Sequence, residues 1–258
     1  MDNVVYRRTK ILATLGPATE SPEVLDRLVK AGVDVVRLNF SHGSPEEHQA
    51  RAERVRAAAK ANGRFVGVLV DLQGPKIRVR RFKKGGILLK HNDDFCLNAD
   101  LARDDGDQTQ VGITYPQLPG DVKENDVLVL DDGMIVLKVR SVEGNKIHTS
   151  VLVGGKLSDG KGINLKGGGL SADALTEKDK EDIKTAALIE ADYVAISFPR
   201  NSGDVKLAKL LLREAGGHGG IVSKIERAEA IENIESITEE SCAIMIARGD
   251  LGVEIGDE

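Results

Sequence analysis

The stretch "VDVVRLNFSHGSPEEHQARAERVRAAAKANGRFVGVLVDLQG", residues 33–74, contains two apolar segments on either side of a charged one. Both apolar segments are rich in Val and Leu and are bounded by turn residues, as buried strands are. The charged segment opens with the signals of a helix start: Ser44 is placed as N-cap, Pro45 follows it, and Glu47 can complete a capping box. Strand, helix and strand in this order predict a right-handed βαβ unit of a parallel sheet.

The same alternation extends to both sides of this unit but is interrupted once. Residues 9–17 precede it as a strand, and strand–helix order resumes at Thr176. Between them, short apolar segments and turns such as Asp132-Gly133 predict a small all-β module. We therefore expect an α/β protein with an inserted all-β module. The expected segments are residues 1–74 and 162–258 for the α/β part and residues 75–161 for the inserted module.

Bulk composition excludes several classes of protein. A net charge of −5 argues against nucleic acid as the main partner, although a local basic groove for a phosphorylated small molecule stays open. No apolar run approaches the roughly 18–20 residues that span a bilayer, and the first residues lack the apolar region of a signal peptide. Cys96 and Cys242 lie far apart in no metal-type spacing, so we expect neither a disulfide framework nor a zinc site. A cytoplasmic protein without a membrane partner is expected.

Polar side chains accumulate at the carboxyl ends of the predicted strands, where parallel α/β folds and TIM barrels place their active sites. In "IVSKIE", residues 221–226, strand alternation puts Lys224 and Glu226 on one face. The last strand is expected over residues 242–252, which carries Asp250 near its end. The other polar residues at strand ends are Arg37, Asn39, Ser41, Asp71, Gln73, Ser197 and Arg248.

This set of side chains suits phosphoryl transfer. Glu226 and Asp250, from adjacent strands, would hold a hard cation such as Mg²⁺ by few protein oxygens, and Lys224 would help to neutralise a phosphoryl group. Arginines that could share this task are Arg37, Arg78 and Arg248. Taken singly, each feature also has a structural reading, because Lys224 and Glu226 could be an edge pair facing water and Asp250 could only shape a turn. Their joint placement favours the catalytic interpretation.

Nine segments of the chain resemble the signature segments of pyruvate kinases, in the same order, from about Arg8 onward. The most specific are "SKIERAEAIENI" and "IMIARGDLGVE". The others are "TKILATLGPAT", "VVRLNFSHG", "VDLQGPKIRV", "LDDGMIVLKV", "DGKGINL", "LTEKDKEDI" and "ISFPR". The resemblance implies a (β/α)₈ TIM barrel with a lid inserted after the third strand. It also implies a glycolytic enzyme that transfers a phosphoryl group from phosphoenolpyruvate to ADP, giving pyruvate and ATP.

The resemblance also implies roles for individual residues. Lys224 matches the catalytic lysine and contacts substrate, and Arg37 matches the arginine that binds the transferred phosphate. Glu226 and Asp250 match the ligands of Mg²⁺ or Mn²⁺. The backbone amides of Gly249 and Asp250 would receive the substrate carboxylate at a helix start.

Two further residue sets follow from the same comparison. The nucleotide contacts match Asn39, His42, Arg78 and Lys161. The monovalent-cation region matches Asn39, Ser41, Asp71 and Leu72. Family members that need K⁺ carry Glu where this chain has Lys76, and a tethered ammonium can supply the charge of a bound K⁺, so we expect no K⁺ requirement.

The chain departs from the family by stopping at Glu258, just after the sixth predicted strand. We therefore expect an incomplete barrel of about six βα units with two open edges, and little or no turnover from the 258-residue chain, whereas the full-length protein would be a homotetramer. Two other functions stay open. One is a non-catalytic fragment that binds only nucleotide or metal, and the other is a Mg²⁺-dependent lyase that acts on pyruvate enolates.

Overall fold

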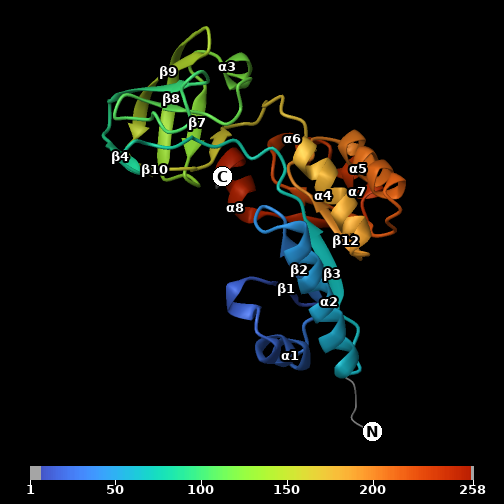
Figure 1. Cartoon of the computed structure of the whole chain (residues 1–258). Helices are drawn as coiled ribbons and strands as arrows, with labels where there is room; N and C mark the ends of the chain where they lie inside the picture. Colours follow the sequence, from blue (N-terminus) through green and yellow to red (C-terminus); the bar gives the residue numbers. More distant parts are fainter. Residues whose placement is uncertain (1–6, 257–258) are drawn as a thin grey trace.

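Residues 7–256 are described by the computed structural model, and six of their strands form one parallel sheet in strict chain order (Figure 1). A doubly wound sheet reverses its strand order, whereas an α/β barrel does not. The predicted fold class, an α/β barrel incomplete at about six units, is confirmed. The strands are β1 (Leu12–Thr14), β2 (Val35–Asn39), β3 (Gly67–Asp71), β12 (Tyr193–Ile196), β13 (Gly220–Ile225) and β14 (Ala243–Ile246).

Helices follow most of these strands and begin at the predicted signals. Ser44 Oγ accepts the N–H of Glu47 at 3.3 Å, and Glu47 Oε2 accepts the N–H of Ser44 at 3.0 Å, which is the predicted capping box. Thr176 and Asp179 form a second one. The helices are η1 (Pro17–Thr19), α1 (Pro22–Ala31), α2 (Pro45–Ala61), α3 (Leu118–Asp121), α4 (Glu177–Leu188), α5 (Ser202–Glu214), α6 (Ala228–Glu232), α7 (Ile234–Glu240) and α8 (Arg248–Ile255).

The strand register gives the parallel sheet two different faces. Alternate residues such as Val36, Val70 and Ile221 pack with the helices in the main apolar core. The residues between them face the other way, and Leu69, Ala195 and Val222 form a smaller cluster there. Toward the carboxyl ends of the strands this second face becomes charged, because Arg37, Asp71 and Lys224 continue the same alternation.

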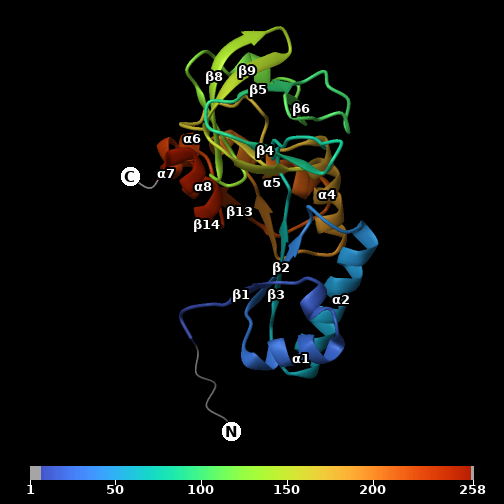
Figure 2. The same cartoon turned by 90° about the vertical axis from the view of Figure 1, so that its left-hand side faces the viewer.

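The chain between β3 and α4 forms a separate all-β part with its own core (Figure 2). One sheet has the order β11-β7-β8-β9-β5-β6, and β10 pairs with β4. The predicted turn at Asp132-Gly133 joins antiparallel strands β7 and β8, and a turn at Gly144 joins β8 to β9. The strands are β4 (Gly86–Leu89), β5 (Asp94–Asn98), β6 (Gln110–Gly112), β7 (Val127–Leu130), β8 (Ile135–Glu143), β9 (Lys146–Val153), β10 (Gly155–Ser158) and β11 (Ile163–Leu165).

The segment boundaries at residues 74 and 161 stay a prediction. Strand β11 pairs with β7 of the inserted part although it lies beyond residue 161. Residues 1–6 and 257–258 of the predicted segments lie outside the described part of the chain.

Two elements differ from the sequence prediction. The strand expected over residues 242–252 is wrong in its second half, because β14 ends at Ile246 and α8 begins at Arg248. Residues 228–240, whose sequence "AEAIENIESITEE" favours one continuous helix, form two helices divided at Asn233, whose side-chain amide donates to the carbonyls of Arg200 and Glu229.

The edge strands β1 and β14 each pair with one neighbour within residues 7–256. Leu12 on β1 is 42% exposed and Ile246 on β14 is 53% exposed, so apolar side chains face solvent at both edges. This matches the open barrel that we expected. None of the helices in the described residues has both the length and the apolar character that a bilayer crossing requires.

We predict that Gly74→Ala destabilises the fold more than Gly63→Ala. Both glycines have left-handed φ values, +66° and +62°. A Cβ at Gly74 would lie 2.7 Å from Ser197 Cβ, whereas nothing lies within 4 Å of one at Gly63. Urea denaturation should show Gly74→Ala losing roughly 1–3 kcal/mol more than Gly63→Ala, the usual cost of overpacking. Equal losses would contradict this prediction, because they would mean that Ser197 can move away from the new Cβ at little cost.

Candidate active site

Lys224 and Glu226 face the same way, as the alternation of "IVSKIE" predicts. Lys224 Nζ lies 2.9 Å from Glu226 Oε1 and 3.4 Å from Asp71 Oδ1. Their side chains are only 13% and 1% exposed. The alternative reading, an edge pair facing water, is therefore wrong.

Arg37 extends this ion-pair network to strands β1 and β2. Its Nε donates to Asp71 Oδ2 at 2.6 Å, its Nη2 also contacts Asp71, and its Nη1 donates to Thr14 Oγ1 at 3.1 Å. Asp71 thus lies between the guanidinium of Arg37 and the ammonium of Lys224. Three predicted site residues from three strands meet at the carboxyl end of the sheet.

Asp250 reaches the site from the first turn of α8, not from the end of a strand as the sequence suggested. Its Oδ1 accepts a hydrogen bond from Lys76 Nζ at 3.0 Å. The first intrahelical bond of α8 runs from the N–H of Leu251 to the carbonyl of Ala247, so the amides of Gly249 and Asp250 precede the hydrogen-bonded ladder. The predicted placement of these two amides at a helix start agrees with the structure.

The electrostatics keep Lys224 charged. Burial is the largest single influence and works to lower the pKa of its ammonium, but Glu226 and Asp71 outweigh it, so this pKa lies above its ordinary value. Burial raises the pKa of the Glu226 carboxyl. Lys224 works to lower this pKa, and the charge of Asp250 works to raise it. Lys224 is therefore a fixed positive donor at neutral pH.

Glu226 and Asp250 fit a divalent cation that takes few protein ligands. Burial is the main cause of the raised pKa of Glu226, and the charge of Asp250 adds to it, so Asp250 lies within electrostatic reach of Glu226. No group of three or more His, Cys, Asp and Glu suited to a metal occurs in residues 7–256. A cation held here would thus use two carboxylates and take its other oxygens from water or substrate, which is the habit of Mg²⁺.

A large cavity of about 1060 Å³ collects part of the predicted nucleotide set. Ser41 and His42 line it from the loop after β2, and Arg78 lines it from the start of the inserted part. Asn39 and Lys161 are absent from this lining among the described residues. Asn39 Oδ1 instead accepts the N–H of Ser41, and Lys161 Nζ lies 2.7 Å from Asp131.

The expected role of Lys76 at the monovalent-cation region stays a prediction. Its ammonium contacts Asp250, whereas the carboxylate of Asp71 forms its ion pairs with Arg37 and Lys224. Leu72, at the same region, is buried, and its carbonyl accepts the hydroxyl of Ser197 at 2.8 Å.

The sequence did not predict that Ser197 and Phe198 hold Lys224 and Glu226 in place. The hydroxyl of Ser197 accepts from Lys224 Nζ at 2.8 Å while it donates to Leu72. The N–H of Phe198 donates to Glu226 Oε2 at 2.9 Å, and Phe198 has a φ of +57°, which is rare for a bulky residue. Ser197 was visible as a polar strand end, but a left-handed Phe leaves no local signal.

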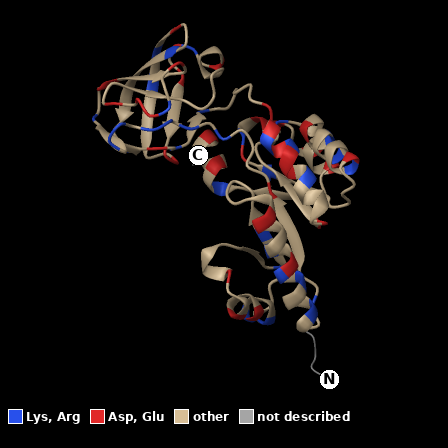
Figure 3. Ribbon diagram, viewed as in Figure 1, with Lys and Arg blue, Asp and Glu red and all other residues tan. Residues whose placement is uncertain are grey.

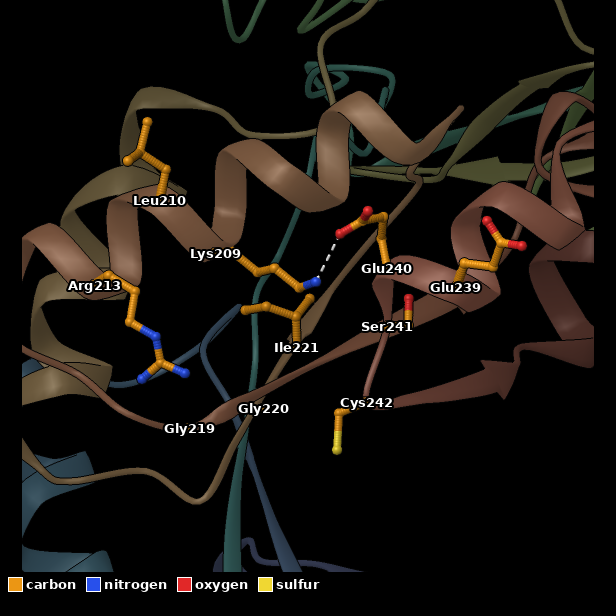
Figure 4. A pocket seen from close by; sticks show the side chains of 10 residues that line it. All are labelled: Lys209, Leu210, Arg213, Gly219, Gly220, Ile221, Glu239, Glu240, Ser241 and Cys242. Carbon is orange, nitrogen blue, oxygen red and sulfur yellow. Dashed lines mark hydrogen bonds and ion pairs between the residues drawn. The ribbon is translucent and has the colours of Figure 1, made fainter.

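A second cavity, of about 520 Å³, lies at the other end of the sheet (Figure 4). Gly220 and Cys242 line it where β13 and β14 begin. Lys209 and Glu240 pair at 2.8 Å within it, so these two charges already satisfy each other. We place the candidate active site at the carboxyl end because the buried charges of several strands converge there.

Comparison with known proteins identifies the family of this chain. The family model for the pyruvate kinase barrel domain matches residues 6–258. The chain belongs to the pyruvate kinase family. The resemblance seen in the signature segments is thereby confirmed.

Curated pyruvate kinases align with nearly the whole chain. It is 56% identical to pyruvate kinase II of Salmonella typhimurium over 254 residues, which is 97% of this chain and 53% of that protein. It is 55% identical to the pyruvate kinase of Haemophilus influenzae, with the same coverage of both chains. It is 43% identical to that of Mycobacterium tuberculosis, over 96% of this chain and 52% of that protein. The chain thus spans about half the length of these pyruvate kinases.

We predict that Lys224→Met destabilises the fold in a pH-dependent way. Without the ammonium, burial and Asp250 would both raise the pKa of Glu226, so the native state would bind more protons than the unfolded state above pH 4.5. Stability should then fall as pH rises through that window. Guanidinium denaturation should show a loss of about 3–5 kcal/mol at pH 8 and a smaller loss near pH 5.

The matched control is Lys83→Met. Lys83 is 56% exposed and lies 3.9 Å from Asp105, so its removal should change stability by no more than about 0.5 kcal/mol. A Lys224→Met loss that is the same at both pH values would contradict the electrostatic account.

Proposed function

We propose that the protein containing this chain is a phosphotransferase that converts phosphoenolpyruvate and ADP to pyruvate and ATP. The observation that carries the proposal is the convergence of Lys224, Arg37, Glu226 and Asp250 at the carboxyl end of the sheet in a pyruvate kinase family member. Phosphoryl transfer depends mostly on positioning and on neutralising charge. This cluster offers fixed cations beside two carboxylates that can hold a divalent ion.

Each residue has a distinct task in the proposed reaction. Lys224, held by Ser197 and Glu226, donates to the phosphoryl group in transit and to the enolate oxygen. Arg37 binds the transferred phosphate, and the amides of Gly249 and Asp250 receive the substrate carboxylate. Glu226 and Asp250 would hold Mg²⁺ or Mn²⁺, which would supply positive charge to the site.

The nucleotide is assigned to the cavity that Ser41, His42 and Arg78 line. Arg78 Nη1 donates to the carbonyl of Gly160 at 2.8 Å, so the guanidinium is already oriented at the cavity wall. Asn39 and Lys161 belong to the same proposed set, and Lys161 reaches the nucleotide only if it leaves Asp131. Figure 3 marks the positions of Lys and Arg in blue along the ribbon of the inserted part.

The remaining parts of the proposal concern the whole protein. Because the chain spans about half of its relatives, we propose low turnover for these 258 residues alone and a homotetramer for the full-length protein. We also propose a cytoplasmic location, where both substrates are available. Neither nucleic acid nor a membrane is part of the proposed function.

The test is a chimera in which residues 6–258 replace the matched half of the Salmonella typhimurium relative. A lactate-dehydrogenase-coupled assay should detect Mg²⁺-dependent pyruvate formation from the chimera and little from the isolated chain. Lys224→Met should lower kcat by a factor of about 100–1,000, while Lys83→Met leaves it unchanged.

Other results of this assay would favour the alternatives. A folded chimera that binds Mg·ADP without turnover would support the non-catalytic reading. Cleavage of a carbon–carbon bond next to a pyruvate enolate would support the lyase.

We further propose that Lys76 removes the need for K⁺. The chimera should keep its rate within about twofold when KCl is added to a tetramethylammonium buffer free of Na⁺ and K⁺, because the tethered ammonium supplies the charge. Lys76→Glu should make the rate rise about tenfold or more with KCl. A tenfold rise for the unmodified chimera would refute the proposal.

A further inference from the structure

The inserted part returns to the barrel through residues 166–172, which include three consecutive glycines. Gly167, Gly168 and Gly169 all have left-handed φ values, +87°, +79° and +98°. Such a segment loses much conformational entropy when it is ordered. Its backbone groups are nevertheless held at several points by side chains and by α8.

Glu229 holds the middle of this return linker. Its Oε1 accepts the N–H of Gly169 at 2.5 Å. Its Oε2 is buried without a hydrogen-bond partner among the described residues. A Cβ at Gly168 would lie 2.8 Å from that Oε2, so the linker backbone lies directly on the carboxylate.

Arg227 holds the end of the linker. Its guanidinium donates to the carbonyls of Leu170 at 3.2 Å and Ala172 at 3.4 Å. Arg227 is only 3% exposed. Burial lowers the pKa of its guanidinium, although the negative charges of Glu229 and Glu254 work to raise it. A buried cation whose hydrogen bonds go to linker carbonyls binds the linker to the start of α6.

A third attachment comes from α8. The carbonyl of Glu254 accepts the N–H of Gly167 at 2.9 Å, and its carboxylate accepts the N–H of Ala228 at 3.0 Å. Burial raises the pKa of this carboxyl to about 7. The linker, α6 and α8 therefore meet at one junction.

The junction is continuous with the candidate active site. Arg227 directly follows Glu226, and its guanidinium lies 5.7 Å from the centre of the Phe198 ring. Phe198 in turn donates its N–H to Glu226 Oε2. Asp250 lies on α8, one turn before Glu254.

We propose that Glu229 and Arg227 are positioning residues that fix the return linker and thereby set the position of the inserted part over the phosphoryl-transfer site. This inference rests on the proposed function in one respect, namely that phosphoryl transfer is the reaction that the position of the inserted part affects. The clamp itself, defined as Glu229 and Arg227 on residues 166–172, can be tested without turnover.

The first experiment uses the 258-residue chain and Glu229→Ala, with Glu232→Ala as the control. Glu232 lies on the same helix and is exposed. Hydrogen–deuterium exchange of residues 166–172 and tryptic cleavage after the exposed Lys166 report on the linker. Glu229→Ala should speed both about tenfold or more, the effect of losing a charge-assisted hydrogen bond, while exchange in β2 and β13 stays unchanged.

Four results would overturn the clamp. Unchanged linker exchange in Glu229→Ala would do so, and so would an equal rise in Glu232→Ala. A uniform rise over the whole sheet would show that Glu229 supports the fold in general. Glu229→Gln keeps an acceptor for Gly169, so it should stay within about threefold of the unmodified chain. A Glu229→Gln chain as labile as Glu229→Ala would also contradict the proposal.

The second experiment measures positioning in the chimera. Glu229→Ala should lower kcat about tenfold and raise KM for phosphoenolpyruvate, with unchanged Mn²⁺ binding. Unchanged kcat and KM with a loosened linker would refute the positioning role. If the unmodified chimera is inactive, the proposed function fails, while the exchange and cleavage results still decide the clamp.

Discussion

A buried ammonium shared by two carboxylates connects the strands at the carboxyl end of the sheet. Lys224 on β13 contacts Glu226 and Asp71, and Asp71 also accepts a hydrogen bond from the guanidinium of Arg37. An isolated buried charge is very costly, whereas a paired one with satisfied hydrogen bonds is tolerated. The network therefore requires the carboxyl ends of β2, β3 and β13 to lie close together, as they do in a parallel barrel.

The same requirement explains why the chemistry gathers at one end. On the second face of the sheet the strands begin with apolar residues such as Leu69 and Val222 and end with Asp71 and Lys224. The apolar half packs the sheet, and the charged half holds groups that only another charge or a substrate can satisfy. This division is also why the cavity near Cys242 carries no comparable network.

The inserted part is attached to this network more directly than its separate core suggests. Its return linker lies on Arg227 and Glu229, which come one and three residues after Glu226 in the chain. The three linker glycines have left-handed φ values, and a Cβ at Gly168 would lie 2.8 Å from Glu229 Oε2. The linker thus joins the inserted part to the segment that follows Glu226.

The sequence by itself determined the parallel α/β architecture, the inserted all-β part, the helix starts and the shared face of Lys224 and Glu226. These follow from local rules, namely strand alternation, capping residues and turn residues, which act over a few neighbours. The family resemblance added the roles of residues such as Arg37 and Asp250.

Only the tertiary structure decided which charges touch. The turn of the chain into α8 after Ile246, the contact of Lys76 with Asp250, and the left-handed Phe198 that aims its N–H at Glu226 carry no local signal. Each joins residues far apart in the sequence or sets a backbone angle that a residue's own preferences oppose. Packing and buried charge determine such features, and these act only once the strands are assembled.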